Sequence, residues 1–323
     1  MFLLWWLAAC SQQHEQSLLF EFPVLQVAPG QQLVSVCQSV SLDNDEPIPV
    51  NKVTMDAGPA WHHANWYYVP EDRFEGPDGT WNCSDRAFET LTGGLWGGVI
   101  YAMSTQTRHE VQAFQPGAAV VIPPRSKLVG EVHLINASDA PVTTSMSLEL
   151  APIPDTAVDI ALQPSMLIYL DLALPPLARS RFSTDCDLAA AWGAPLDMRI
   201  HYVLPHYHEL GDGFGLEVLG GAADGQSVFQ AESAIGEPLG GTLDPPVDIS
   251  GADGLRFSCS YQNTTSDVVG WGLGGREMCV GLAFVDSPFR WILLVQGGTE
   301  YQGQSDGVME YEGACEVFTL RAG

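Results

Sequence analysis

Short runs of apolar residues, each bounded by Gly, Pro, Asp or Asn, recur along the whole chain. Their lengths and the spacing of the turns between them predict the antiparallel strands of β-sandwiches, and no stretch keeps a long helical period. The clearest candidate strands are residues 32–42, 127–136, 142–150, 165–174, 197–210, 254–261 and 277–286. The pattern therefore predicts an all-β protein.

The Pro-rich segment 151–164 is the best candidate for a domain boundary, because it divides the chain into two halves of similar length. We expect a signal and tether at 1–29, an N-terminal sandwich at 30–155 and a C-terminal sandwich at 156–323. A chain of 323 residues is long enough for two such domains with real cores. Its 33 Gly and 22 Pro residues supply many turns, in agreement with two antiparallel, jelly-roll-like β-sandwich domains.

Acidic residues outnumber basic ones by a wide margin: 39 Asp and Glu stand against 13 Lys and Arg, and the formal net charge is −26. Hydrophobic residues make up 46% of the chain and charged residues 16%, a balance typical of a globular protein rather than a disordered one. The scarcity of Lys and Arg excludes nucleic acid as a partner, because phosphate contacts need clustered basic side chains. It also disfavours flat binding to an anionic lipid surface.

The apolar run at 2–9 ends in Leu7-Ala8-Ala9 and is followed by Cys10. This arrangement resembles a bacterial lipobox, which implies cleavage before Cys10 and acylation of that cysteine. The run is too short to span a bilayer as a helix. We therefore expect an extracytoplasmic protein that is anchored to a bacterial membrane only by lipid, facing the periplasm or on the cell surface. Because the first basic residue is Lys52, we expect the true start to lie a few residues upstream.

Six further cysteines follow, and none of them forms a CxxC pair: Cys37, Cys83, Cys186, Cys259, Cys279 and Cys315. An even number of cysteines in an exported protein predicts three disulfides formed in an oxidising compartment. The spacing alone leaves many pairings open.

The histidines carry the candidate chemistry. His206 and His208 stand two residues apart in a strand-like segment, so both imidazoles point from one face and can bind one metal ion. Taken alone, this pair fits a partly exposed polar strand face better than a metal site. His62 and His63 are adjacent and would face opposite sides of a regular strand, unless the backbone turns near Gly58-Pro59.

His133 is the lone histidine of its strand, which is typical of a structural residue. Met278 taken alone indicates a core position. No thiolate or carboxylate cluster lies near these histidines in the sequence, which disfavours Zn and Ca. Imidazole together with a thioether suits copper, since the soft sulfur favours Cu(I).

Several segments resemble, in chain order, the copper type II ascorbate-dependent monooxygenases, the family of peptidylglycine alpha-hydroxylating monooxygenase and dopamine beta-monooxygenase. The resemblance covers roughly residues 30–320. The matching segments are VSVCQSVSL (34–42), AWHHANWYYVP (60–70), QPGAAVVIPPRSKLVGEVHLINAS (115–138), LALPPLARSRFSTDC (172–186), PHYHELG (205–211), FSCSYQNT (257–264) and VGWGLGGREMCVGLAFV (269–285).

The resemblance implies two copper ions facing a cleft between the two domains. The implied ligands of the first copper, which stores and delivers an electron, are His62, His63 and His133. The implied ligands of the second, catalytic copper, which binds O2 and removes a hydrogen atom from the substrate, are His206, His208 and Met278. The implied disulfides are Cys37–Cys83, Cys186–Cys315 and Cys259–Cys279.

The resemblance further implies hydroxylation of a C–H bond in a small organic substrate, with O2 as oxidant and ascorbate or another one-electron donor as co-substrate. The chain departs from the family where substrate is chosen. Leu204 stands where the peptide-hydroxylating member has an Arg, and Gly281-Leu282 stands where the family has polar residues. We expect an apolar pocket without a fixed cation, and a monomeric protein.

Two other functions remain open from the sequence. One is a surface lipoprotein that binds or delivers copper without turnover, and the other is a cell-surface binding module in which the histidines are incidental. His109 and His201 have no role in the resemblance and are expected to be structural or solvated, while His14 belongs to the tether.

Overall fold

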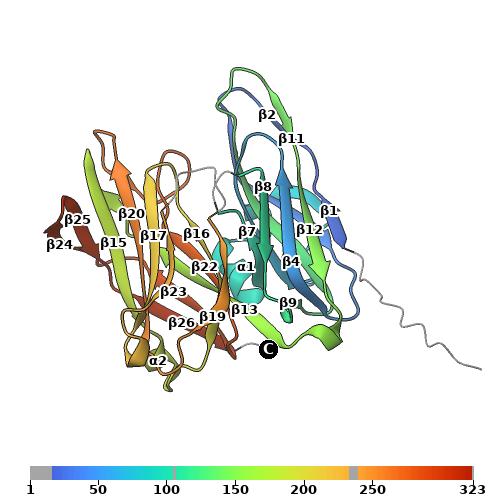
Figure 1. Ribbon diagram of the computed structural model, residues 1–323. Coiled ribbons are helices and arrows are strands. Elements are labelled where there is room, and N and C mark those ends of the chain that lie inside the picture. The colour runs from blue at the N-terminus through green and yellow to red at the C-terminus, as the bar shows by residue number, and fades with distance from the viewer. Residues whose placement is uncertain (1–16, 105–106, 233–238, 322–323) are drawn as a thin grey trace, which may run out of the picture.

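The computed structural model describes residues 17–104, 107–232 and 239–321. It consists of two β-sandwiches that stand side by side (Figure 1). The fold class predicted from the apolar pattern, all-β with two antiparallel sandwiches, is confirmed. Cys10 and the lipobox-like run lie outside the described residues. Among the described residues, no helix is long and apolar enough to cross a membrane.

The N-terminal half is built from twelve strands. They are β1 (Leu18–Glu21), β2 (Leu25–Val27), β3 (Gln32–Ser41), β4 (Ile48–Ala57), β5 (Trp61–Pro70), β6 (Gly79–Asn82), β7 (Gly98–Ala102), β8 (His109–Ala113), β9 (Ala118–Ile122), β10 (Ser126–Ile135), β11 (Val142–Thr144) and β12 (Met146–Pro152). One sheet has the order β6-β3-β10-β5-β7, and the facing sheet contains β1-β12-β4-β9, with β8 paired to β4. A short ribbon of β2 and β11 extends beyond them.

The C-terminal half is built from fourteen strands. They are β13 (Ile160–Tyr169), β14 (Ala173–Leu174), β15 (Ala178–Asp187), β16 (Arg199–His206), β17 (Gly211–Leu219), β18 (Ser227–Ala231), β19 (Gly241–Asp248), β20 (Gly254–Asn263), β21 (Val269–Gly270), β22 (Val280–Val285), β23 (Phe289–Val295), β24 (Glu300–Ser305), β25 (Val308–Glu312) and β26 (Glu316–Arg321). One sheet contains β13-β22-β16-β19, with β23 paired to β13 and β26 paired to β23. The other has the order β18-β17-β20-β15-β25-β24.

Helical structure in the described chain is confined to short pieces at the ends of strands. These are α1 (Thr90–Trp96), α2 (Leu188–Trp192) and three 3-10 turns, η1 (Cys83–Arg86), η2 (Asp155–Ala157) and η3 (Gly221–Ala223). All seven strands predicted from the apolar runs are present, although two of them are divided: 142–150 between β11 and β12, and 165–174 between the end of β13 and β14.

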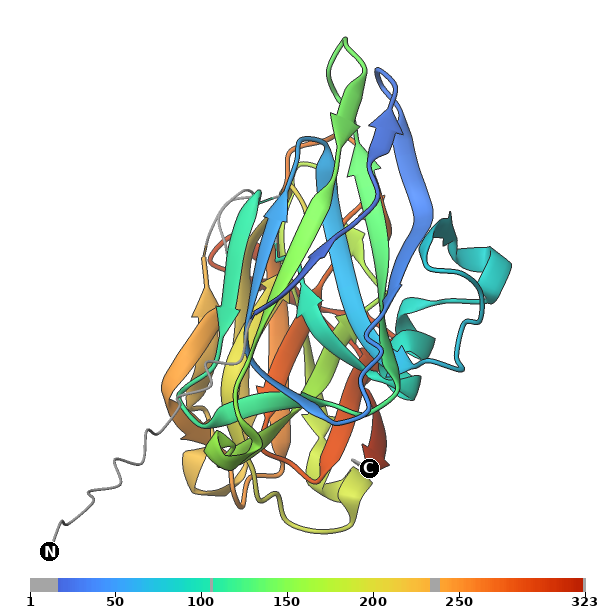
Figure 2. The same cartoon turned by 90° about the vertical axis from the view of Figure 1, so that its right-hand side faces the viewer.

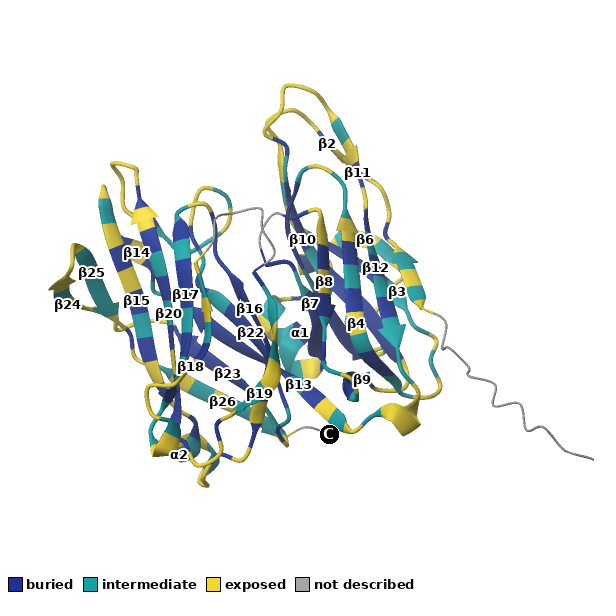
Figure 3. Cartoon of the chain, viewed as in Figure 1, coloured by how far each residue is buried: buried dark blue, intermediate teal, exposed yellow. Residues whose placement is uncertain are grey.

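Strand β13 joins the two halves. Its first residues pair in parallel with β9 of the N-terminal half, and its remainder pairs with β22 of the C-terminal half. One continuous sheet therefore runs through both sandwiches. Figure 2 views the molecule from the N-terminal half, whose blue and green strands lie in front of the orange and red strands of the C-terminal half. The core of the N-terminal half also includes Leu204, Leu282 and Phe284 from the C-terminal half, and the facing strands are buried where the halves meet (Figure 3). The two halves thus share apolar surface.

Three disulfides close the chain in the pairing that the family resemblance implies: Cys37–Cys83, Cys186–Cys315 and Cys259–Cys279. The last bond joins β20 to the segment just before β22. It therefore anchors the residue that follows Met278.

The pairing of β5 with β10 places the histidines of the N-terminal half, and a glycine on β10 makes room for a packed indole between these strands. Gly130 lies directly opposite Trp66, whose indole is fully buried and stacks on Phe22 at a ring distance of 3.8 Å. A Cβ at residue 130 would lie 2.5 Å from the indole ring. The space above this glycine is thus filled by Trp66.

We expect Gly130→Ala to lower the free energy of unfolding by about 1–3 kcal/mol, because the methyl group must displace a packed indole. Gly297→Ala is the matched control, since a Cβ at residue 297 meets nothing within 4 Å. Urea denaturation of the native protein and both variants measures the difference. Equal stability of the two variants would contradict this account of β5–β10 packing.

Candidate metal centre

Five histidines from three distant segments meet where the two halves touch. The ring centroids of His62 and His208 are 4.9 Å apart, and those of His63 and His206 are 5.3 Å apart. His62, His63 and His133 form one group whose nitrogens lie within 4.8 Å of one another. His63, His206 and His208 form a second such group, so His63 belongs to both. The rings are therefore in contact across the interface, closer than two sites facing each other over an open, solvent-filled cleft.

A β-bulge explains how two adjacent histidines serve one site. On β10, His133 pairs with His63 and Leu134 pairs with Trp61, so His62 is an extra residue on β5. A bulge breaks the alternation of side chains, which lets His62 and His63 reach the same side. The sequence predicted a turn near Gly58-Pro59, but the decisive irregularity lies at His62 itself.

Strand alternation places the other pair as the sequence predicted. His206 is the last residue of β16 and His208 follows two positions later, while Tyr207 between them is buried in the core of the C-terminal half. Both histidines are less than 10% exposed, at 8% and 3%. The interpretation of this pair as a partly exposed polar face is therefore wrong.

Hydrogen bonds fix the tautomers of both residues in the pair. The Nδ1 atom of His206 lies 2.9 Å from the carbonyl oxygen of Ser104, and Nδ1 of His208 lies 2.7 Å from that of Arg276. A carbonyl oxygen can only accept, so each Nδ1 must carry the proton and donate it. The lone pair of each imidazole is then on Nε2, the arrangement typical of metal-binding histidines.

Several nitrogens in the cluster have no protein partner. Neither ring nitrogen of His133 has a hydrogen-bond partner, and neither does Nε2 of His208, although all three atoms are buried. The Nδ1 atoms of His62 and His63 lie 3.3 Å apart. Since an unpaired buried polar atom is costly, a metal ion bound to Nε2 of His208 and to the unprotonated nitrogen of His133 would remove most of the penalty. The residues therefore fit one or two metal ions held by imidazole.

Burial keeps the five imidazoles neutral, the form that binds a metal. Loss of hydration, reinforced by the neighbouring histidines, lowers the pKa of His62 to about 3 and that of His133 to about 4. The same burial lowers the pKa of His206 to about 3, although the hydrogen bonds to two backbone carbonyl groups act to raise it. Burial also lowers the pKa of His63 and of His208.

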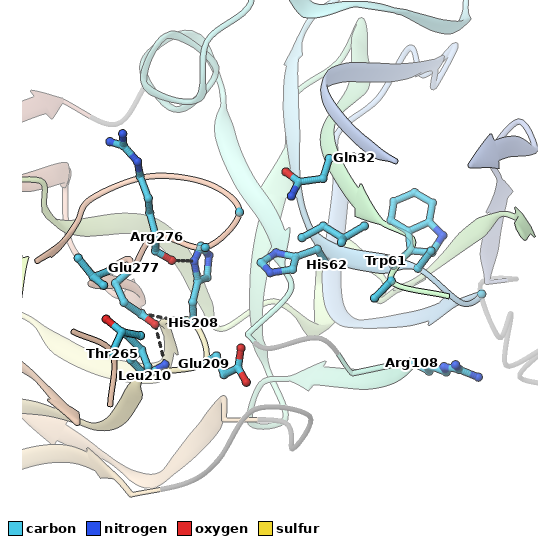
Figure 4. A pocket seen from close by; sticks show the side chains of 17 residues that line it. Gln32, Trp61, His62, Arg108, His208, Glu209, Leu210, Thr265, Arg276 and Glu277 are labelled. Carbon is cyan, nitrogen blue, oxygen red and sulfur yellow. Dashed lines mark hydrogen bonds between the residues drawn. The ribbon is translucent and has the colours of Figure 1, made fainter. Parts of the chain in front are cut away.

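A buried carboxylate organises the segment that carries the pair. Glu277 accepts hydrogen bonds from the backbone N–H of His208 at 2.9 Å, of Leu210 at 2.7 Å and of Met278 at 3.3 Å. Figure 4 shows this carboxylate beneath His208, whose ring faces His62 of the other half. Burial raises the pKa of Glu277 to about 7, and the three N–H groups oppose that rise. Glu277 belongs to a motif of the family resemblance, but its role depends on backbone groups distant in sequence and was not predicted.

Two cavities adjoin the histidine cluster. An open cavity of about 630 Å³ is lined by His62 and His208, with polar groups such as Gln32, Glu209 and Thr265 (Figure 4). A second cavity of about 400 Å³ has a mainly apolar wall. Its lining includes His63, His206, Met278, Leu204 and Leu282. Met278 thus lines the same cavity as His63 and His206, and its role as a sulfur ligand stays a prediction.

The remaining described histidines lie outside the cluster. His109 is exposed and pairs with Asp56, with Nδ1 2.7 Å from the carboxylate. His201 is buried between Gln115 and Asp286, at 3.2 Å and 3.5 Å respectively. His14 lies outside the described residues. Both described histidines thus have structural partners, as predicted.

The acid sensitivity of the metal-free protein follows from these pKa values. In the unfolded chain, His133 takes up a proton near pH 6.5, whereas in the folded protein its pKa is about 4. The unfolded state therefore binds more protons between these pH values, and the free energy of unfolding falls as the pH drops. Between pH 7 and pH 5, His133 alone accounts for about 2 kcal/mol of this loss. We expect His133→Gln to lose that much less stability than the native protein over this interval in urea denaturation. Identical pH dependence in the two proteins would contradict the burial of a neutral His133.

No family model matches the chain, and no curated protein matches it. Among solved structures, the major capsid protein P2 from bacteriophage PM2 is similar over 84% of this chain and 97% of its own, at 9% identity and a TM-score of 0.35. The PBSX exported protein XepA is similar over 83% of this chain and 86% of its own, at 11% identity and a TM-score of 0.22. PNGF-II is similar over 83% of this chain and 65% of its own, at 8% identity and a TM-score of 0.32. Similarities this weak carry no conclusion about function.

Proposed function

We propose that the protein is a copper-dependent monooxygenase that hydroxylates a C–H bond of a small apolar molecule, using O2 and an external electron donor. The observation that carries the proposal is the cluster of five buried, neutral histidines, drawn from both halves, at the edge of an apolar cavity. The order of motifs, which resembles the copper type II ascorbate-dependent monooxygenases, points to the same chemistry.

The donor set favours copper over other metals. Both groups of potential ligands consist of histidine alone, and a methionine lines the cavity beside them. Imidazole and thioether together suit a metal that cycles between Cu(I) and Cu(II). Bound copper would supply one-electron transfer and activation of O2. His62, His63 and His133 would hold one ion, and His206, His208 and Met278 would hold the other.

The apolar cavity is the proposed substrate site. Leu204, Leu282 and Leu294 contribute to its wall, and no Lys or Arg is among its described lining residues. Its acidic lining residue, Glu131, is partly buried and accepts a hydrogen bond from Thr90 at 2.6 Å. Without a cation to pair with, an anionic substrate would lose its hydration with no compensation. The cavity therefore favours apolar substrates over those that carry a carboxylate.

The open cavity offers a separate approach for the electron donor. Hydroxylation places one oxygen atom of O2 in the C–H bond and reduces the other to water, which consumes two electrons and two protons from the donor. A small polar reductant such as ascorbate can approach His62 and His208 through the open cavity while the apolar cavity holds substrate. The three disulfides support the proposal of an oxidising, extracytoplasmic compartment. Lipid anchoring at Cys10 is part of the proposal and rests on the sequence alone.

We expect the copper-loaded protein to consume O2 in the presence of ascorbate and of small apolar compounds, with hydroxylated product formed. Peptides ending in glycine should give no turnover, because Leu204 cannot pair with their carboxylate. Oxygen uptake and mass spectrometry of the products measure both outcomes. Met278→Ala should lower product formation at least tenfold while His62, His63 and His133 still bind copper.

Copper binding without reductant-dependent O2 consumption on any compound would contradict the monooxygenase and leave a copper-binding lipoprotein. Clear hydroxylation of a glycine-terminated peptide would contradict the assignment of the apolar cavity as the substrate site.

A further inference from the structure

A segment of the N-terminal half holds a histidine of the C-terminal half. His206 lies at the end of β16, yet its Nδ1–H is directed at the carbonyl oxygens of Ser104 and Met103, at 2.9 Å and 3.2 Å. These two residues follow β7 in the other sandwich. The tautomer of His206 is therefore set by groups outside its own half.

The conformation of that segment depends on a second buried carboxylate. Glu110, on β8, is 1% exposed and accepts hydrogen bonds from the hydroxyl of Ser104 at 2.6 Å and from its backbone N–H at 3.2 Å. It also accepts one from the hydroxyl of Tyr101 at 2.8 Å. Three charge-assisted hydrogen bonds on one buried carboxylate leave the Ser104 backbone little freedom.

Ser104 also has a direct bond to the C-terminal half. Its hydroxyl oxygen accepts a hydrogen bond from the backbone N–H of Leu239 at 3.1 Å, while the same hydroxyl group donates a hydrogen bond to Glu110. Ser104 thus makes two polar contacts across the interface, through its carbonyl group to His206 and through its hydroxyl to Leu239. It is fully buried, so the loss of either contact is not repaired by water.

We propose that Ser104 and Glu110 form an inter-domain clasp, which positions His206 for metal binding and couples the second metal group to the N-terminal half. Both are positioning residues, since they act through His206 rather than on a metal or substrate. The inference rests on the proposed function, because it takes His206 to be a copper ligand. It predicts that a hydroxyl in one sandwich controls copper affinity in the other.

The test is copper titration against a competing chelator, with full-length protein in two backgrounds. His133→Ala leaves His206, His208 and Met278 intact, and in that background Ser104→Ala should weaken copper binding about tenfold or more. His208→Ala instead removes a ligand of the second group, and in that background Ser104→Ala should leave the affinity of the remaining site unchanged. Thr107→Ala is the matched control, because its hydroxyl is in the same segment and, among the residues that the structure describes, bonds the backbone of His109 alone.

A selective loss in the first background, absent with Thr107→Ala, supports the clasp. Equal affinities for Ser104→Ala and the control, or equal losses in both backgrounds, would overturn it while leaving copper binding intact. A native protein that binds no copper would overturn the clasp and the proposed function together. If circular dichroism shows that Ser104→Ala does not fold, Glu110→Gln replaces it in both backgrounds. Glutamine keeps the shape of the side chain but has one hydrogen-bond acceptor fewer, and the same outcomes support or overturn the clasp.

Discussion

The burial of five neutral imidazoles at the contact between two sandwiches is the constraint on which the rest of the site depends. Buried imidazole nitrogens without partners are unfavourable, and three such atoms occur in His133 and His208. The fold must therefore hold these rings in place by other means. It does so with a bulge at His62, with strand alternation at His206 and with apolar contact between the halves around Leu204 and Leu282.

The two metal groups are supported in different ways. The N-terminal group is carried within a paired sheet, where His63 lies directly opposite His133. The C-terminal group lies at the end of a strand and is supported by buried carboxylates, Glu277 through the N–H of His208 and Glu110 through Ser104. The pKa of each carboxyl group is raised by burial, and the hydrogen bonds each accepts oppose that rise. One of these carboxylates comes from each half, so the second group depends on both.

Much of this arrangement could be predicted from the sequence, because it depends on local patterns and on the order of motifs. Strand positions, the three disulfides and the spacing of His206 and His208 belong to that part. The bulge at His62 could not be predicted, since it depends on the register with β10, more than sixty residues away. The same holds for the clasp at Ser104, which joins segments about a hundred residues apart. Helix α1 was missed because its sequence, TLTGGLW, contains two glycines and has no helical period.

The central claim is that the two halves together hold two copper ions, and copper stoichiometry tests it most directly. Purified protein reconstituted with copper is compared with His62→Ala and Met278→Ala by metal analysis and electron paramagnetic resonance. The account predicts two coppers per native chain, with each variant disturbing a different ion. One copper or none in the native protein would contradict it.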